Sequence, residues 1–437
     1  MNTALPEGET CLMTAAGTGS LRAVKALLVR GANVNAVEEW RGQTALMWAA
    51  AEGHVSVVDA LIEAGADVHA RSKAGFTPLL FAVRQGSVTA VRSLVKAKAS
   101  VNDIAKAAAI SSNSTAKPVS DATSALGMAV INGHFEVAGV LLDNGADPNA
   151  PDARGSIFHA LAWIRKPGAS GGDQAPPQPT GGLDSLGLAK ALLKNGGNPN
   201  IRIAWEEIPF DRDDGEVKSP PNIRVGRDYI SLVGATPFYL AAKNGDVELM
   251  RLLAAHGADP LLPTVQNVTP LMAAAGLGTW AGETPGPLNG TPEVERLEAL
   301  RLALALGSDI HAVADFGDVP IVGDPIKLFT SYPENLEQLP KTALGDMRWS
   351  GSTALHGAVT TNQRSIIQFL VDNGAKLDAR NKLGWTPLMV AEGGQYGATV
   401  KEFPESVALV RKLMSERGMD PEQHSKAGAK RVATSAR

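Results

Sequence analysis

RGQTALMWAAAEGHVSVVDALIEAGADVHARSK, residues 41–73, decides the fold of this chain because it encodes two short helices and the turns that join and close them. Thr44 stands where a helix N-cap belongs, since its hydroxyl can accept a backbone N–H of the first turn. Gly53 marks the turn into a second apolar run, and Gly65 follows that run where a left-handed residue ends a helix at little cost. The stretch therefore predicts two antiparallel helices followed by an extended loop.

The same pattern returns along the chain at a constant interval. Three pairs of threonines are each 33 residues apart: Thr44 and Thr77, Thr236 and Thr269, and Thr353 and Thr386. Nine cores of this kind stand in register: Thr10–Ala15, Thr44–Ala49, Thr77–Ala82, Ser124–Ala129, Ile157–Ala162, Thr236–Ala241, Thr269–Ala274, Thr353–Ala358 and Thr386–Ala391. A 33-residue period of a turn and two helices with a T-P-L-x-x-A signature resembles the ankyrin repeat.

The resemblance implies an all-α fold, a solenoid of about nine helix-turn-helix repeats with extended finger loops and inserted hairpins or loops. In such an array each repeat is too small to bury its own apolar face and packs on its neighbours. The long insertions between the repeats resemble bacterial ankyrin-repeat proteins more than the compact animal type.

Insertions divide the predicted array into segments. We predict repeats 1–3 over residues 1–102, an inserted loop over 103–123, and repeats 4–5 over 124–200 with a loop insertion at 165–183. An inserted hairpin is predicted over 201–233, followed by repeats 6–7 over 234–311 with a loop insertion at 276–290. A long inserted loop over 312–349, repeats 8–9 over 350–421 and a disordered polar tail over 422–437 complete the chain.

Some positions depart from the repeat pattern. Lys98 occupies the slot of the closing glycine, so the helix end there is expected to be atypical. Ile157 occupies the threonine slot, so a capping hydroxyl is expected to be missing from that helix. Residues 104–110 are expected to add a helical turn, and alternating apolar and polar residues in 201–210 and 222–233 predict the two strands of the inserted hairpin.

Composition limits the classes of partner and of chemistry. The formal net charge of −4 argues against nucleic acid as a partner, because nucleic-acid binders usually carry a basic excess. The single cysteine, Cys11, excludes an internal disulfide and a thiolate metal site, and its apolar slot in the repeat predicts a small core residue. No apolar run reaches about 18 residues, so membrane insertion is not expected.

The start of the sequence carries no signal-peptide pattern, which makes the cytoplasm the default compartment. Residues 2–4 look like the trailing loop of a preceding repeat, and Thr10 opens a repeat with no polar cap before it. We hypothesise that the sequence is an N-terminally shortened product. A lost export signal would then place the protein in the periplasm or outside the cell, whereas a stop codon with no in-frame repeat upstream would contradict the hypothesis.

No motif for catalysis or cofactor binding stands out. The sequence contains no Walker loop and no G-x-S-x-G elbow, and repeat position accounts for most of the histidines. His356, for example, follows T-x-L, where the resemblance implies hydrogen bonds within and between repeats. We therefore expect no enzyme activity, no cofactor and no metal. A small-molecule or metal site formed by the inserted loops around Trp205, Asp211–Asp214 and Tyr229 is an alternative that a thermal-shift screen would test.

The resemblance implies that partners bind in a concave groove lined by finger loops and first helices. In this chain the residues that flank the finger glycines or precede the inter-helix glycines are expected to line it: Trp40, Arg41, Arg71, Lys73, Phe76, Arg84, Gln85, Arg154, Lys243, Arg380, Lys382 and Trp385. Arginines and large aromatic side chains suit an interface, and the basic bias predicts a protein partner with an acidic surface. The alternative is that these are ordinary solvated finger residues.

The preferred function is a non-catalytic scaffold or adaptor that mediates protein–protein interaction. A second hypothesis makes this sequence the recognition region of a larger exported enzyme or redox protein whose catalytic part lies N-terminal to it. The full-length open reading frame would separate the two.

Overall fold

The computed structural model describes residues 5, 7–106, 122–152, 155–166, 179–205, 208–211, 216–218, 230–278, 292–316, 349–396 and 399–428. Over these residues the chain forms nine consecutive pairs of helices. The helices fall into two compact units. Unit 1 comprises Met1–Ser111, Pro118–Ile164 and Pro176–Asn198, and unit 2 comprises Ser112–Lys117, Arg165–Ala175 and Pro199–Arg437. The predicted boundaries thus divide the chain more finely than the two units do.

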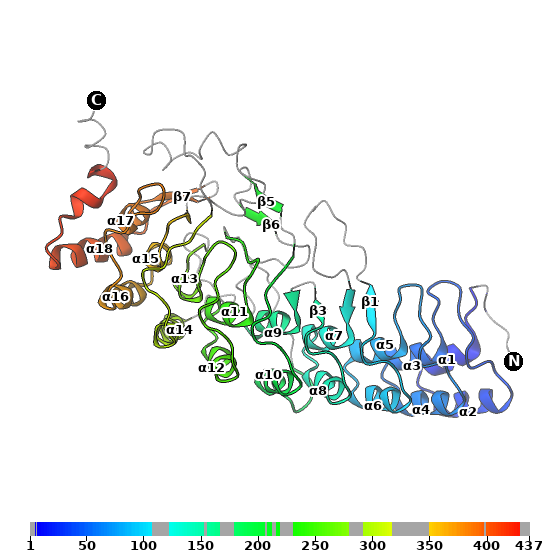
Figure 1. The fold of residues 1–437 in the computed structure, drawn as a ribbon. Coiled ribbons are helices and arrows are strands. Elements are labelled where there is room, and N and C mark those ends of the chain that lie inside the picture. Colours follow the sequence, from blue (N-terminus) through cyan, green and yellow to red (C-terminus); the bar gives the residue numbers. More distant parts are fainter. Residues whose placement is uncertain are drawn as a thin grey trace. The chain divides into compact units, whose positions relative to one another are not determined.

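Unit 1 is a stack of helical pairs (Figure 1). Its first helices are α1 (Cys11–Gly17), α3 (Ala45–Ala51), α5 (Pro78–Gln85), α7 (Ala125–Ile131) and α9 (Ile157–Arg165, whose last residue falls in unit 2). Its second helices are α2 (Leu21–Val29), α4 (Val55–Glu63), α6 (Val88–Lys96), α8 (Phe135–Asp143) and α10 (Ser185–Lys194). From α1 to α7, first helices pack on first helices, and from α2 to α10, second helices pack on second helices. The core therefore runs between successive pairs, as the repeat argument requires.

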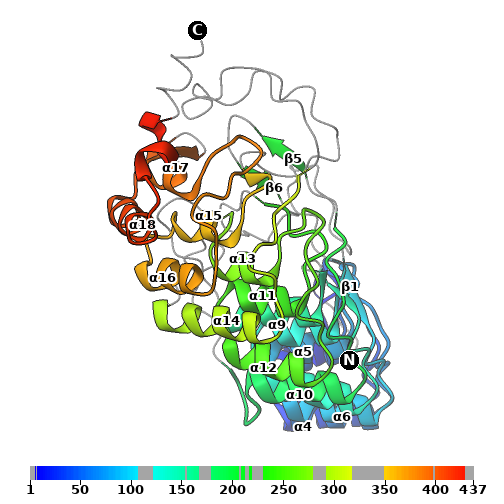
Figure 2. The same ribbon diagram turned by 60° about the vertical axis from the view of Figure 1, so that its left-hand side comes forward.

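Unit 2 repeats this arrangement in two rows (Figures 1 and 2). One row contains α11 (Pro237–Lys243), α13 (Pro270–Ala274), α15 (Ala354–Ala358) and α17 (Pro387–Ala391). The other contains α12 (Val247–Ala255), α14 (Glu293–Ala305), α16 (Arg364–Asp372) and α18 (Pro404–Glu416). Within the described residues, no helix of either unit combines the length and apolar character needed to cross a lipid bilayer.

Threonine caps start most of the first helices, as the sequence predicts. The Thr44 hydroxyl accepts the backbone N–H of Met47 at 3.4 Å, and the Thr236 hydroxyl accepts that of Tyr239 at 3.1 Å. The expectation that α9 lacks a capping hydroxyl is wrong. Ser156, one residue before Ile157, accepts the His159 N–H at 3.4 Å and lies 2.8 Å from His159 Nδ1. The repeat core there begins at Ser156, one residue before the position that the sequence pattern predicts.

Among the described residues, four two-stranded antiparallel hairpins extend the loops. They are β1–β2 (Ile104–Lys106 and Ala122–Ser124), β3–β4 (Pro151–Asp152 and Gly155–Ser156), β5–β6 (Ile208–Asp211 and Glu216–Lys218) and β7–β8 (Gly394–Tyr396 and Thr399–Lys401). The helical turn predicted from residue 104 is wrong, because Ile104–Lys106 pairs as a strand. In the excursion over 201–233 the strands lie at 208–211 and 216–218, and 222–229 lie outside the described residues.

Two predictions about the chain ends need correction. Cys11 is exposed, because no described helix packs on that side of α1, whereas the equivalent Ala45 of α3 is buried. The tail is not disordered throughout: Pro421–His424 forms a 3₁₀ helix, and the His424 carbonyl accepts the Thr386 hydroxyl at 2.6 Å. Residues up to 428 therefore pack on the last repeat, and 429–437 lie outside the described residues.

The turn that ends each second helix requires a left-handed residue. Glycine fills that position in most repeats, for example Gly31, Gly65 and Gly145, with φ of 78°, 85° and 88°. Lys98 fills it after α6, with φ of 71°. A residue with a Cβ is strained there by about 1–2 kcal/mol.

Lys98→Gly is therefore expected to raise the free energy of unfolding by about 0.5–1 kcal/mol, since relief of this strain exceeds the added entropy of an unfolded glycine. Urea titration followed by circular dichroism measures the change. Lys96→Gly is the matched control, because Lys96 is an exposed residue in the last turn of α6. That control is expected to be destabilising by up to about 1 kcal/mol. Destabilisation by both substitutions would contradict the account.

Asparagines join the closing turns of neighbouring repeats. Asn102 donates to the Gly145 carbonyl at 3.1 Å and accepts the Asp147 N–H at 2.9 Å. Asn35, Asn149 and Asn200 make the same pair of bonds to the repeat that follows each of them. We call these four residues the clamp asparagines. Each links two repeats because the nitrogen of its side-chain amide donates one hydrogen bond and the oxygen accepts another.

Asn102→Ala is expected to lower the free energy of unfolding of unit 1 by about 1 kcal/mol, because two hydrogen bonds between repeats are replaced by bonds to water. Denaturant titration measures the loss. Asn195→Ala is the control: the Asn195 amide donates only to the Ala191 carbonyl of its own helix, at 2.9 Å. A loss of cooperativity, seen as a broader transition, is expected for Asn102→Ala and not for the control.

Candidate functional site

Two adjoining hollows lie along the first helices and finger loops of unit 1. The hollow on the finger side has a volume of about 330 Å³, and Trp40, Lys73 and Phe76 are among the residues that line it. The second has a volume of about 360 Å³ and is lined in part by Thr18, Trp48 and Glu52. Arg41, Gln43, Phe81 and Arg84 line both hollows, which therefore form one continuous depression across the first three repeats. We call it the unit 1 groove.

A buried carboxylate shapes the finger that carries Trp40 and Arg41. Glu38 is 5% exposed and accepts the backbone N–H groups of Trp40 at 2.7 Å, Arg41 at 2.9 Å and Gln43 at 2.7 Å. Burial raises the pKa of Glu38, but these donors and the nearby Lys73 charge outweigh it and hold that pKa below its ordinary value. The ionised carboxylate thus holds the finger loop in its turn through three backbone hydrogen bonds.

Backbone hydrogen bonds hold adjacent fingers side by side. The Glu39 N–H donates to the Glu7 carbonyl at 2.8 Å, and the Lys73 N–H donates to the Arg41 carbonyl at 2.8 Å. Lys73 Nζ also bonds to the Glu39 carbonyl. The finger side of the groove is therefore built on three linked loops, which restrains its cationic and aromatic residues before any partner arrives.

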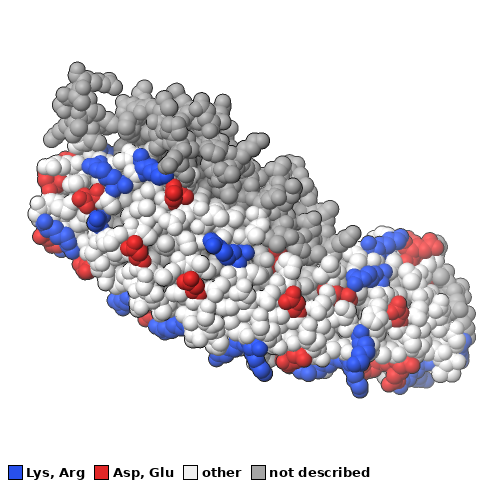
Figure 3. Space-filling view, in the orientation of Figure 1, with Lys and Arg blue, Asp and Glu red and all other residues white. Residues whose placement is uncertain are grey.

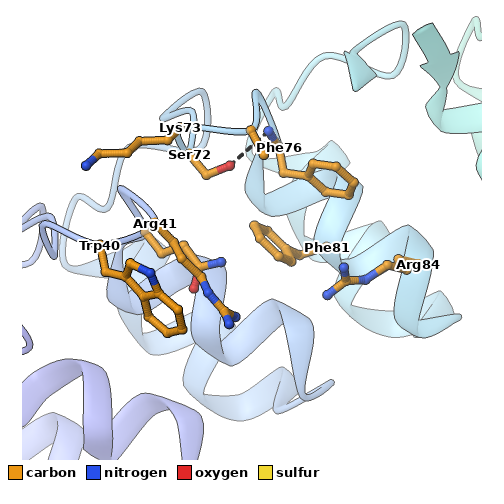
Figure 4. A pocket seen from close by; sticks show the side chains of 9 residues that line it. Trp40, Arg41, Ser72, Lys73, Phe76, Phe81 and Arg84 are labelled. Carbon is orange, nitrogen blue, oxygen red and sulfur yellow. Dashed lines mark hydrogen bonds between the residues drawn. The ribbon is translucent and has the colours of Figure 1, made fainter. Parts of the chain in front are cut away.

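Aromatic rings lie beside both arginines of the groove (Figure 4). The Arg41 guanidinium carbon is 4.1 Å from the centre of the Trp40 ring. The Arg84 guanidinium carbon is 5.2 Å from the Phe81 ring and 5.6 Å from the Phe76 ring, and the two phenylalanine rings pack with centres 5.3 Å apart. Contacts of this kind favour a cation and limit the positions of its flexible side chain.

The groove carries an uneven charge. Arg41, Lys73 and Arg84 line the finger-side hollow, and no acidic residue is among its described lining residues. Neither arginine forms an ion pair with another described residue. By contrast, cationic and anionic side chains are interspersed over the second helices of unit 1 in the face shown by Figure 3. The surplus of positive charge is thus a local property of the groove.

The other residues predicted to contact a partner have different roles in the structure. Lys243 and Trp385 are each 2% exposed, so the prediction that they present side chains to a partner is wrong. The Trp385 carbonyl instead lies 3.1 Å from His356 Nε2 of the preceding repeat. The ring is buried within unit 2.

Three further residues predicted to contact a partner form ion pairs or hydrogen bonds with neighbouring loop residues instead. Arg71 pairs with Asp103 at 2.8 Å and donates to the Gly75 carbonyl at 3.1 Å. Arg380 donates to the Gly384 carbonyl at 2.7 Å, and Lys382 pairs with Asp315 at 2.8 Å. Gln85 is exposed at the end of α5, and Arg154 lies outside the described residues.

Sequence reasoning missed the residues that form the floor of the groove. Thr14, Trp48 and Phe81 line it, and each stands four residues after the capping threonine of its repeat. Such positions face the same side in successive repeats, so repeat alignment could have found them. The finger glycines, which guided the prediction, identify only the rim. The alternative site around Trp205 has only Trp205 with a described side chain, and it is 3% exposed.

Matches to family models support the repeat assignment. Residues 1–72 and 69–152 match the family described as "Ankyrin repeats (3 copies)", and residues 233–265 and 350–382 match "Ankyrin repeat". Among solved structures, the human ASB11 ankyrin repeat domain is 22% identical, with a TM-score of 0.42, over 68% of this chain and 98% of that one.

Proposed function

This chain is an ankyrin-repeat protein, and from that premise we propose that it is a non-catalytic scaffold that holds a protein partner in the unit 1 groove. Ankyrin repeats generally mediate protein–protein interaction, and the family is generally non-catalytic. The observation that carries the proposal is the pair of arginines, each packed on aromatic rings and without an ion-pair partner among the described residues, at the junction of two hollows.

The groove has the composition of an interface centre. Tryptophan and arginine are enriched among residues that dominate binding energy, and here they sit side by side as Trp40 and Arg41. Trp40 is 67% exposed although it is one of the largest apolar side chains in the chain. A partner that covers it removes apolar area from water. Because the fingers are already linked by hydrogen bonds, little of their conformational entropy would be lost on binding.

Charge reversal in the groove tests the proposal. Arg41→Glu with Arg84→Glu is expected to weaken binding of a partner at least tenfold while leaving the circular-dichroism melt nearly unchanged. Arg71 is kept, because its bonds to Asp103 and Gly75 stabilise the fingers. A photo-crosslinker at Gln85, an exposed residue beside Arg84, would capture the partner in extract of the source organism. Titration calorimetry with the purified partner then measures affinity.

The matched control is Arg22→Glu with Lys25→Glu, which makes the same change in charge at two exposed residues of α2, outside the groove. This control is expected to bind the partner as the unaltered chain does. Equal loss in both double variants would indicate a general charge effect. Full binding by the groove variant would show that the partner binds elsewhere.

A further inference from the structure

We infer that the feature recognised in the unit 1 groove is a short acidic segment of the partner in which an apolar side chain is flanked by two carboxylates. The inference rests on the proposed function and names the chemistry that the groove selects. It follows from the positions of two guanidinium groups, the apolar surface between them and one glutamate at the far end.

The two guanidinium groups are suited to carboxylates. Arg41 lies over the Trp40 ring at 4.1 Å, and Arg84 lies over Phe81 at 5.2 Å. A guanidinium that contacts rings through its face keeps the N–H groups of its edge for an external acceptor. Two parallel hydrogen bonds from that edge match the two oxygens of a carboxylate. Because neither group has an ion-pair partner among the described residues, an incoming carboxylate displaces no internal one.

An apolar surface separates the two cations. In Figure 4 the Phe81 side chain lies between Arg41 and Arg84. Phe81 lines both hollows but is only 5% exposed, and the half-buried rings of Phe76 and Trp48 each extend the aromatic surface in one hollow. An apolar side chain of the partner placed over Phe81 would have a carboxylate–guanidinium pair on each side, one at Arg41 and one at Arg84. These pairs would limit its contact with water. The groove thus combines one apolar contact with two charged contacts, one on each side.

The distribution of charge gives the segment a direction. Lys73 lines only the finger-side hollow and Glu52 lines only the other, whereas Arg41 and Arg84 line both. A carboxylate near Glu52 would be repelled. We therefore expect the acidic residues to lie toward the fingers, and a neutral or basic residue to follow toward Thr18 and Glu52. This polarity separates the inference from simple attraction between a basic surface and an acidic protein.

Peptide display with the full chain as bait tests the inference without a known partner. A library of random twelve-residue peptides is expected to yield binders in which a leucine, isoleucine, valine or phenylalanine lies between Asp or Glu residues. The enrichment is expected to disappear when Arg41→Gln with Arg84→Gln is the bait, and to persist with Arg22→Gln and Lys25→Gln on α2. Selection of neutral or basic peptides would overturn the inference.

Synthetic versions of a selected peptide make the test quantitative. Fluorescence anisotropy is expected to show at least tenfold weaker binding when both acids become glutamine, and a similar loss when the apolar residue becomes serine. The loss on neutralising the acids is expected to vanish in the Arg41→Gln, Arg84→Gln chain, because the interacting pair is already broken. Binding of a phosphoserine version with no binding of the glutamate version would overturn the assignment to carboxylates.

Failure of the inference is distinguishable from failure of the proposed function. Trp40→Ala and Phe76→Ala remove the aromatic lining without changing charge. If selected peptides lose affinity in these variants but not when their acids are neutralised, the groove binds a partner and the acidic pattern is wrong. If no groove substitution alters peptide binding, the proposed location is wrong as well.

Discussion

Leu61→Ala is expected to lower the free energy of unfolding of unit 1 by about 2–5 kcal/mol, the largest loss among the substitutions considered, because it opens a cavity where helices of different repeats meet. Leu61 lies on α4 and is 0% exposed. Its helix packs on α3 of its own repeat and on α2 and α6 of the neighbouring repeats. The cavity would therefore weaken three contacts between helices, and a stack held by nearest neighbours has few other contacts to compensate.

Urea titration followed by circular dichroism measures the loss, and native-state hydrogen exchange locates it. Exchange is expected to accelerate in α3, α4 and α6 and to change little in unit 2. Val29→Ala is the matched control, because Val29 on α2 is an aliphatic residue that is 88% exposed. It is expected to change stability by less than about 0.5 kcal/mol. Similar losses for the two substitutions would show that Leu61 does not lie in a shared core.

Acidification from pH 7.5 to pH 5 is expected to destabilise unit 2 by about 2 kcal/mol through His356 alone. His356 is fully buried, and burial lowers its pKa from 6.5 to about 4, although the hydrogen bond to the Trp385 carbonyl opposes this shift. Its Nδ1 accepts the Thr353 N–H at 3.1 Å, and its Nε2 lies 3.1 Å from the Trp385 carbonyl. The neutral ring with a proton on Nε2 satisfies both contacts.

The sign follows from proton binding in the two states. Below about pH 6.5 the unfolded chain protonates His356, whereas the folded chain leaves it neutral until about pH 4. Protons therefore favour the unfolded state, and the stability present above pH 6.5 is lost as the pH falls toward 4. Denaturant titrations across this range measure the slope.

His356→Gln is expected to be less stable at pH 7.5 and to have a flatter dependence on pH. His256→Gln, at an exposed histidine of the same unit, is the control and is expected to keep the slope of the unaltered chain. An unchanged slope in His356→Gln would show that another group titrates.

The stacked fold could be predicted from sequence because its signals are local and repeated. A capping threonine, an apolar helix face and a closing glycine can each be recognised within a few residues of sequence. Their return every 33 residues then identifies the repeat. Ser156 shows where such reasoning fails. The sequence pattern places the start of this repeat core at Ile157, which has no hydroxyl, whereas the helix is capped by the hydroxyl of Ser156 one residue earlier. Strands such as Ile104–Lys106 are three residues long, too short to show a period of two.

The site could be predicted in part for the same reason. Repeat position predicted Trp40, Arg41 and Arg84 as groove residues, and the three line one hollow, since the finger and the end of the first helix recur in every unit. It could not indicate burial. Lys243 occupies the repeat position of Arg84, and Trp385 that of Phe76, but both are 2% exposed.

The clamp asparagines have a consequence for how the groove moves. The slot that holds Asn35, Asn102 and Asn149 in unit 1 holds His69 after the second repeat, and no hydrogen bond joins the His69 side chain to the third repeat within the described residues. The joint between the second and third repeats therefore lacks the two side-chain bonds that join the other repeats of unit 1, and the backbone bond from Lys73 to Arg41 links the fingers there. Trp40 and Arg41 belong to the second repeat and Phe76, Phe81 and Arg84 to the third, so any opening of this joint would separate the two sides of the groove.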